Sequence, residues 1–528
     1  MKRAVLIVVL LLVMLPSNSF AGYCLSAKRG GKTSLMFKRY LADLADNSSG
    51  FAVVVPVGTA MDADGDVFAD KEITGILISE KASWTDDHGK PMVVITGAIH
   101  GNEWATPEVC LGIAEYLLAN KDNDRPARDD LGALINEGQG KAAGAAAKDA
   151  IVPRINSIRE LLKTVQVLII PVLNPEGYDY SHTPAGRASY YNSGWRPNRR
   201  PTRDLTGGAE QVCYKKDGSR YAAPPAGAEH CFLADYDATE EGGDLEEEEV
   251  VVCETVDGKA VHLFESSLEV ASAEMFDAIY NSTEPARVVC ASNQRRVWKE
   301  QWASNGADSV SLVRAGTEGY LQEAVGVDLN RNFQYKWDVA QGQKALFIRS
   351  RSPSSRMYRG NGSISERETS AMERLIAKKK VVALIDYHSG TTQVLYPYAY
   401  STGDRVKGSY LGDRTGNGDY RVFRLVSEKI ASLLNRHDRK DKSIVNFTAA
   451  QNYNNISVGS GVARDCYYQT EKIAAINIEV HDGRYTYEDE EFRKIVPEIC
   501  KTNVPGAIWF LFWAADLEGQ PGPGENGR

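Results

Sequence analysis

The chain has little of what marks several large classes of protein. It contains only 46 glycines and 20 prolines in 528 residues, too few for a collagen-like or a generally disordered chain. Its 61 lysines and arginines are outnumbered by 70 aspartates and glutamates, which gives a net charge of −9. The basic residues form no cluster, whereas a nucleic-acid binder needs one to neutralise phosphates. We therefore expect no nucleic-acid partner, and the sequence has no internal repeat.

Apolar runs long enough to cross a membrane are also missing. One short run, over 4–15, comes after Lys2 and Arg3 and is followed by a small-x-small sequence that ends at Ala21. This order is typical of a secretory signal peptide, which we place at 1–21. The alternative is an uncleaved membrane anchor, but about 12 apolar residues are too few for a span of ~20. We expect a secreted or periplasmic protein without a membrane span.

The cysteines lack the Cys-x-x-Cys spacing that is typical of thiolate zinc sites. There are eight of them, at positions 24, 110, 213, 231, 253, 290, 466 and 500. An even number in a secreted chain is typical of structural disulfides, and buried thiols are the alternative. The pairing stays open, because connectivity cannot be deduced from the sequence.

Apolar runs of strand length are present, and they predict the fold. Four of them are rich in valine, isoleucine and leucine, at 92–95, 165–172, 381–385 and 473–480. Such runs are typical of strands that are buried on both faces of a sheet. Helical patterns lie around them, at 34–45, 107–118, 155–163, 366–378, 423–435 and 507–515. The alternation predicts an α/β fold with a mostly parallel mixed sheet flanked by helices.

The segment 201–325 interrupts this alternation. It holds four of the cysteines and the acidic block 246–249, which we interpret as a solvated face, with calcium binding as the alternative. We expect one main domain over 22–518, in which 201–325 is a large inserted subdomain. The Gly- and Pro-rich end, 519–528, is expected to be a disordered tail. We expect the protein to be a monomer.

Side chains suited to metal binding follow three of the predicted strands. His100 and Glu103 lie where the first strand ends and a helix begins; His388 and Glu479 lie at or near the ends of two others. In an open α/β sheet the carboxyl ends of the strands form the ligand crevice, so we expect these side chains to meet there. Two histidines and a glutamate are a known ligand set for catalytic zinc. A second His-x-x-Glu sequence, 262–265, lacks this context, and we interpret it as ordinary packing.

Seven short segments between about residues 90 and 485 match a known family, in the family's order. They are GAIHGNEW, IIPVLNPEGYDYSH, GWRPNR, GVDLNRNF, YRGNGSISERET, LIDYHSG and INIEVHDGRY. On these segments the chain resembles the zinc metallocarboxypeptidases of the carboxypeptidase A/B type. The resemblance implies a zinc-carboxypeptidase-like fold and hydrolysis of the C-terminal peptide bond of peptides or proteins.

The resemblance also implies a role for each residue of the metal centre. His100, Glu103 and His388 would bind one zinc ion. Asp328 would orient the first zinc histidine, and such partners fix the tautomer of the ring and raise its basicity. Glu479 would be the general base that takes a proton from the attacking water and later gives it to the leaving amine.

Three further residues are implied to contact the substrate. Arg196 would stabilise the oxyanion of the tetrahedral intermediate. Asn330 and Arg331 would bind the free C-terminal carboxylate, for which a planar guanidinium gives a paired, charge-assisted contact. The expected partners are therefore peptide or protein C-termini. For both arginines the alternative is an ordinary surface ion pair.

The sequence departs from the family where the substrate would be clamped. Asn102 replaces an arginine beside the zinc glutamate, and Gly390 stands where a tyrosine often follows His-Ser. Counted back from Glu479, the family's mobile capping tyrosine falls on Ser457. The candidates to replace it are Tyr453, Tyr467 and Tyr468. Hydrolysis is still expected, because the metal ligands, the base and the carboxylate anchor are all present.

The same count places Arg464 in the family's side-chain pocket. An arginine there would favour a C-terminal glutamate or aspartate, through charge pairing in a partly desolvated pocket. The alternative is a differently built loop, in which Arg464 faces solvent or pairs with Asp465.

The expected function is that of a secreted zinc carboxypeptidase that removes single C-terminal residues. One alternative keeps the zinc chemistry but acts on cell-wall peptides that carry D-amino or diamino acids. A second alternative is a catalytically silent peptide-binding protein, which the presence of all the metal and base residues disfavours.

Overall fold

The described part of the chain leaves out both ends and most of the insertion. In the computed structural model it comprises residues 33–60, 71–128, 134–135, 151–183, 186–187, 194–200, 326–337, 357–360, 362–401, 403–411, 418–436, 446–451, 459–481 and 489–517, with five short strands between 211 and 290. The expected signal peptide and tail lie outside these residues.

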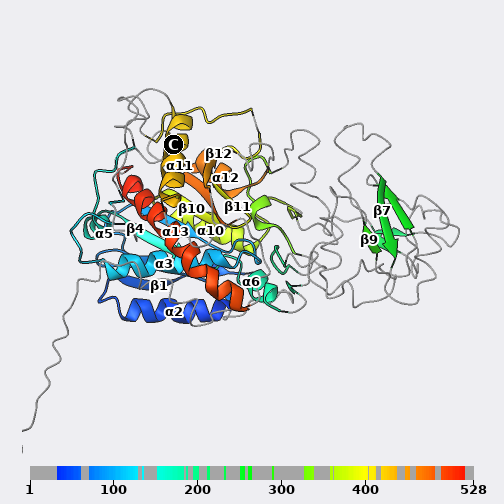
Figure 1. Cartoon of the computed structure of the whole chain (residues 1–528), viewed down its shortest axis with the longest axis horizontal. Coiled ribbons are helices and arrows are strands. Elements are labelled where there is room, and N and C mark those ends of the chain that lie inside the picture. The colour runs from blue at the N-terminus through cyan, green and yellow to red at the C-terminus, as the bar shows by residue number, and fades with distance from the viewer. Residues whose placement is uncertain are drawn as a thin grey trace, which may run out of the picture.

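A mixed sheet of eight strands forms the centre of the molecule (Figure 1). In spatial order its strands are β1 (Ala52–Thr59), β2 (Glu72–Ile78), β4 (Gln166–Ile170), β3 (Met92–Thr96), β10 (Val381–His388), β13 (Ala474–His481), β11 (Thr391–Leu395) and β12 (Thr448–Ala450). The inner strands β4, β3, β10 and β13 are parallel to one another. Antiparallel pairs join β1 to β2, β2 to β4 and β11 to β13. The predicted mostly parallel mixed sheet is confirmed.

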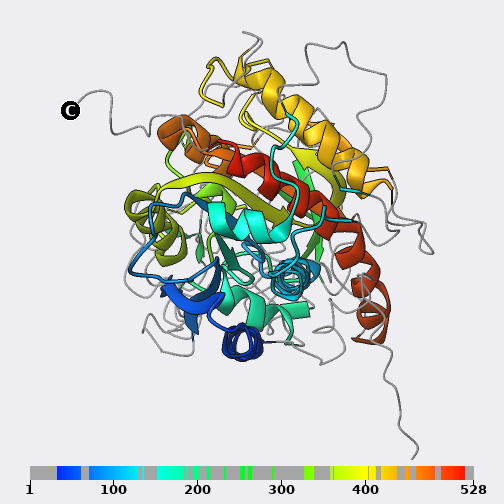
Figure 2. The same cartoon turned by 90° about the vertical axis from the view of Figure 1, so that its left-hand side faces the viewer.

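Helices cover both faces of this sheet. They are α2 (Ser34–Asp46), α3 (Ala105–Ala119), α5 (Ile158–Thr164), α6 (Pro175–Ser181), α10 (Arg367–Lys378), α11 (Asp419–Leu434), α12 (Ala463–Glu471) and α13 (Asp489–Ala515). Apolar side chains of α2, α3, α5, α11 and α13 form a larger core, and those of α10 and α12 line a smaller one. Figure 2 shows α10 and α13 on opposite sides of the sheet. No helix in the described ranges is long and apolar enough to cross a membrane.

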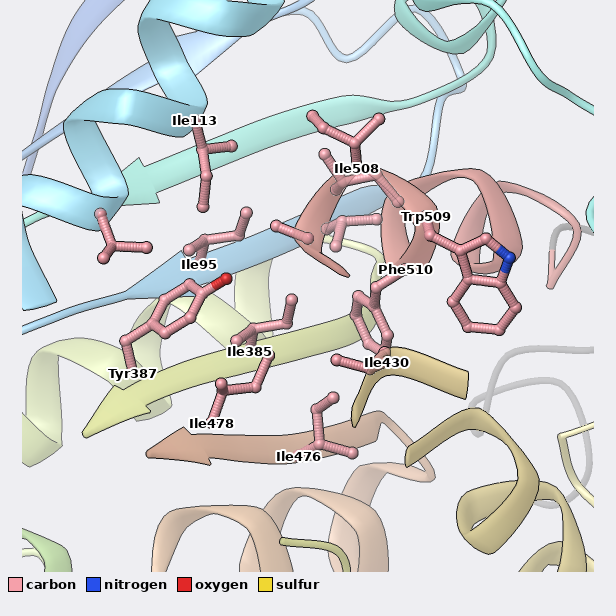
Figure 3. Packing of buried hydrophobic residues seen from close by; sticks show 14 of the residues in the cluster. Ile95, Ile113, Ile385, Tyr387, Ile430, Ile476, Ile478, Ile508, Trp509 and Phe510 are labelled. Carbon is pink, nitrogen blue, oxygen red and sulfur yellow. The ribbon is translucent and has the colours of Figure 1, made fainter. Parts of the chain in front are cut away.

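Successive residues of a buried strand belong to the two cores in turn. On β3, Val93 and Ile95 lie in the larger core, whereas Met92 and Val94 lie in the smaller one. This follows from the strand geometry, because successive side chains point to opposite faces. Figure 3 shows the larger core, where side chains of β3, β10 and β13 pack toward Phe510 of α13. Burial on both faces explains why these strands are near-continuous apolar runs.

The described strands of the insertion form two sheets of their own. They are β5 (Gln211–Cys213) with β6 (Cys231–Leu233), and β7 (Val250–Thr255) with β8 (Ala260–Phe264) and β9 (Val288–Cys290). Their register places Cys213 opposite Cys231, and Cys253 opposite Cys290. Among the described residues, Cys110, Cys466 and Cys500 are buried free thiols. Buried thiols, the alternative to disulfides, are therefore what the structure shows at these three positions.

Candidate metal centre

A tight turn between β3 and α3 carries His100 and Glu103. Gly101 is required in this turn, because a Cβ atom on it would lie 2.4 Å from the Gly177 carbonyl oxygen. The Gly101 N–H donates to the Arg196 carbonyl oxygen at 2.9 Å. The turn is therefore held against the segment that supplies Arg196.

His388 and Glu479 come from neighbouring parallel strands. His388 is the last residue of β10, and the strand register pairs it with Glu479 of β13. Because β3 is the other parallel neighbour of β10, both residues lie at the same edge of the sheet as the turn after β3. His388 is buried, whereas Glu479 is partly exposed.

Three of these side chains, His100, Glu103 and His388, form a cluster of metal-binding atoms. One ligand atom from each lies within 4.8 Å of the others. Glu103 Oε1 is 2.8 Å from His100 Nδ1, and Glu103 Oε2 is 3.1 Å from His388 Nδ1. The two Nδ1 atoms are 3.2 Å apart. Both imidazoles thus present Nδ1 to one buried carboxylate.

The charges around this cluster favour a cation at its centre. Burial alone would raise the pKa of Glu103, but His100 and His388 hold it well below its usual range. Burial would lower the pKa of His388, but Asp386 and Glu103 raise it well above its ordinary value. The cluster therefore stabilises positive charge. Two imidazole nitrogens and one carboxylate fit zinc, with a position left for water or substrate.

Each imidazole has a buried aspartate behind it. His100 Nε2 is 3.1 Å from Asp328 Oδ1, and His388 Nε2 is 2.8 Å from Asp386 Oδ2. Arg196 Nε donates to the other oxygen of Asp328 at 3.0 Å. Asp328 was expected from the sequence, whereas Asp386 was not. The signal that could have found Asp386 is the Asp-x-His spacing at the end of a buried strand, since residues i and i+2 share one face.

Arg196 and Asn330 reach the metal-binding cluster from outside the parallel strands. Arg196 Nη1 is 3.6 Å from Glu103 Oε1. Asn330 Nδ2 is 3.2 Å from His388 Nε2, and Asn330 Oδ1 accepts the N–H of Ala463 at 2.9 Å. The second contact joins Asn330 to the start of α12.

The buried guanidinium of Arg331 is acted on by the charges of two other arginines, Arg196 and Arg464. The pKa of Arg331 is lowered to about 10 by burial and by the charges of Arg196 and Arg464, while Asp328 opposes this shift. Like charges that disfavour each other in a buried site favour an incoming anion. We call these three residues the arginine group.

Arg464 lies at the start of α12 and is only 4% exposed, so the alternative in which it faces solvent is wrong. Burial lowers its pKa, and Asp465 and Glu479 oppose this shift. Its Nη2 donates to the Gln451 carbonyl oxygen at 3.3 Å. Its Nε forms an ion pair with Asp465 Oδ1 at 3.9 Å, so the other alternative, pairing with Asp465, is what the structure shows. This Nε has no hydrogen-bond partner within the described ranges. The Asp465 carboxylate itself accepts from two backbone N–H groups.

The two described candidates for a capping tyrosine, Tyr467 and Tyr468, are held in the core. Tyr467 packs edge-on against Phe333, with ring centroids 5.2 Å apart. The Tyr468 hydroxyl donates to Asp419 at 2.9 Å. Both side chains are almost fully buried, which leaves neither free to swing over a substrate. Tyr453, the third candidate, lies outside the described residues.

The sequence matches the family model described as zinc carboxypeptidase, of peptidase family M14, over 39–131, 136–243 and 287–502. It is 33% identical over 121 residues to carboxypeptidase A1 of Mus musculus, covering 23% of this chain and 24% of that protein. It is 34% identical over 79 residues to mast cell carboxypeptidase A of Rattus norvegicus, covering 15% and 18%. It is also 34% identical over 82 residues to inactive metallocarboxypeptidase ecm14 of Talaromyces marneffei, covering 14% and 13%. These alignments span about a quarter or less of each relative's length.

Two solved structures align over most of the chain. Bovine thrombin-activatable fibrinolysis inhibitor gives a TM-score of 0.48 at 14% identity, covering 93% of this chain and 98% of that one. Carboxypeptidase A from Helicoverpa armigera gives a TM-score of 0.47 at 16% identity, covering 94% and 80%. The family assignment depends on the sequence match and not on these likenesses.

Proposed function

The chain belongs to the zinc carboxypeptidase family, and from that premise we propose that it is a secreted, zinc-dependent enzyme that hydrolyses the C-terminal peptide bond of peptides or proteins. The observation that carries the proposal is the buried cluster of His100, Glu103 and His388 with the arginine group beside it. The cluster suits hydrolysis, and the arginine group suits the anionic end of a peptide. The signal-like pattern over 1–21 supports secretion.

The residues of the cluster and Glu479 divide the chemistry between them. His100, Glu103 and His388 would hold one zinc ion, which when bound polarises the scissile carbonyl and acidifies the attacking water. Glu479 is next to His388 across the strands and partly exposed. It therefore accepts the proton of the attacking water and passes it to the leaving amine. Arg196 donates to the carbonyl oxygen as that oxygen becomes anionic.

Binding of a free C-terminus makes the enzyme an exopeptidase. Arg331 and Asn330 hold the terminal carboxylate, and the planar guanidinium gives this contact both charge and direction. A peptide bound through an internal bond has no terminal carboxylate at this position. The binding energy of the carboxylate with Arg331 and Asn330 therefore favours cleavage of the last residue of a chain.

Arg464 gives the site a preference for acidic C-terminal residues. A terminal glutamate or aspartate carries a second carboxylate, and Arg464 is close enough to Arg331 to lower its pKa. Arg464 is paired with Asp465 at 3.9 Å, but its Nε makes no hydrogen bond within the described ranges, so this N–H can donate to the carboxylate of a substrate side chain. Charge pairing in such a buried pocket favours an acidic side chain over an apolar or basic one.

A residue-release assay on purified full-length protein tests these statements. The substrates are matched peptides that end in Glu, Phe or Lys, and one that ends in Glu with an amidated C-terminus. We expect fastest release from the free Glu peptide, none from the amidated one, and complete loss with a chelator that added zinc reverses. Equal rates on the three free peptides would contradict the acidic preference. No release from any peptide by zinc-loaded protein would contradict the enzyme and support the silent peptide binder.

A further inference from the structure

Asp386 is a buried carboxylate without a place in the reaction described above. It lies on β10 two residues before His388, so the two side chains share one face of the strand. Asp386 is 1% exposed, and its Oδ2 is 2.8 Å from His388 Nε2. Aspartates are almost never buried to this extent unless a partner stabilises their charge.

Thr96 holds the other oxygen of this carboxylate. Thr96 of β3 is the register partner of Asp386 across the sheet, and its hydroxyl donates to Asp386 Oδ1 at 2.7 Å. The neighbouring strand therefore holds one oxygen, and the His388 ring holds the other. Groups fixed on strands in this way are placed more precisely than groups on loops.

His388 needs a hydrogen-bond acceptor at Nε2 if its Nδ1 is to bind a metal ion. Nδ1 is the atom that faces Glu103 and His100. A neutral imidazole carries one proton, and the nitrogen that binds the metal cannot carry it. The proton is then on Nε2, where Asp386 accepts it. Asn330 cannot replace Asp386, because its Nδ2 near this nitrogen is a donor.

We propose that Asp386 is the positioning residue of the second metal-binding histidine, and that it holds His388 with Nδ1 facing the zinc ion. The inference rests on the proposed function only for the identity of the metal ligands. Asp328 has the matching place behind His100, but it also accepts from Arg196. Asp386 accepts from the neutral Thr96 hydroxyl, so more of its charge acts on the imidazole. A carboxylate in this place raises the basicity of the ring and so its affinity for metal.

The test compares the zinc affinity of full-length wild-type protein with that of Asp386→Asn, measured by competition with a chromophoric chelator. The substitution keeps the shape of the side chain and removes its charge. We expect a loss of zinc affinity of about 10- to 100-fold. The visible spectrum of the cobalt-loaded proteins is a second readout, and it should shift because the His388 ring is differently held. Unchanged affinity with an unchanged spectrum would overturn the proposal.

Asp419→Asn is the matched control. Asp419 is also fully buried, and it accepts hydrogen bonds from the Tyr468 hydroxyl and from two backbone N–H groups rather than from a metal-binding residue. We expect wild-type zinc affinity in this variant. An equal loss in both variants would mean that any buried aspartate has this effect, and it would overturn the proposal.

A second variant keeps the inference testable if Asp386→Asn does not fold. Thr96→Val removes the hydroxyl that holds Asp386 and should weaken zinc binding in the same direction by a smaller factor; no loss would count against the proposal. Wild-type protein that binds zinc but releases no residue would refute the proposed function and leave this inference standing.

Discussion

The metal-binding cluster and the arginine group are adjacent but built in opposite ways. In the cluster, each imidazole contacts Glu103 through one nitrogen and a buried aspartate through the other. The arginine group instead gathers guanidiniums of like charge, and the pKa of Arg331 is lowered to about 10 by burial and, despite Asp328, by its two arginine neighbours. The metal-binding cluster and its aspartates thus have an excess of buried negative charge, whereas the arginine group has an excess of buried positive charge.

This difference indicates what each half takes from outside. The cluster gains stability from a cation, and the arginine group gains it from an anion. Asp328 joins the two, because it contacts both His100 and Arg196. Substitutions in the metal-binding cluster should therefore change zinc content and turnover. Substitutions in the arginine group should change substrate binding and selectivity while zinc stays bound.

The largest effect is expected in the cluster. Glu103→Gln removes the charge that lies between the two imidazoles, so zinc should be lost. Peptide hydrolysis should fall by more than about a thousandfold, because the metal supplies several kcal/mol of transition-state stabilisation. Atomic absorption gives the zinc content, and residue release gives the rate. If the variant kept the wild-type zinc content and rate, Glu103 would not be a metal ligand.

Glu479→Gln should separate proton transfer from metal binding. We expect kcat to fall about 10²- to 10⁴-fold, since the amide cannot accept the proton of the attacking water. Zinc content should stay at the wild-type level, because Glu479 is not part of the cluster. A variant with wild-type kcat would refute its role as the base.

Arg331→Met tests whether the arginine group holds the terminal carboxylate. We expect kcat/KM on free peptides to fall about a hundredfold, mainly through KM, because one partner of a buried charge pair is lost. Bound zinc should not change. If kcat/KM on the free peptides stayed at the wild-type value, the carboxylate would not be what Arg331 binds.

The smallest effect is expected for Arg464→Met, and it concerns selectivity. The ratio of kcat/KM for peptides ending in Glu and in Phe should fall about tenfold, equivalent to the loss of about 1.4 kcal/mol of charge pairing. The rate on the Phe peptide is the internal control and should change little. A ratio equal to that of wild type would mean that Arg464 does not contact the side chain of the substrate.

The inner strands could be predicted from the sequence, but β11 and β12 could not. The runs that predict β3, β4, β10 and β13 are apolar throughout, because these strands are buried between two cores. β12 has only three residues, and β11 begins with two threonines and a glutamine. Strands of this length and composition have no distinctive local pattern. Pairing with a neighbour in the sheet is what makes them strands.

The family resemblance drawn from seven short segments is confirmed by the match of the zinc carboxypeptidase model over most of the chain. The structure brings His100, Glu103 and His388 together, although the two histidines are 288 positions apart. The roles expected for Glu479, Arg196, Asn330 and Arg331 stay predictions. The substitutions described above test these roles.

By itself, the sequence determined the class of fold, the family and the residues that could bind zinc, because burial on both faces of a sheet and short motifs are visible in neighbouring positions. Only the tertiary structure decided that Asp386 contacts His388 and that Arg464 is buried. Hydrogen bonds and desolvation depend on which distant residues fold against a side chain, and no spacing along the chain contains that information.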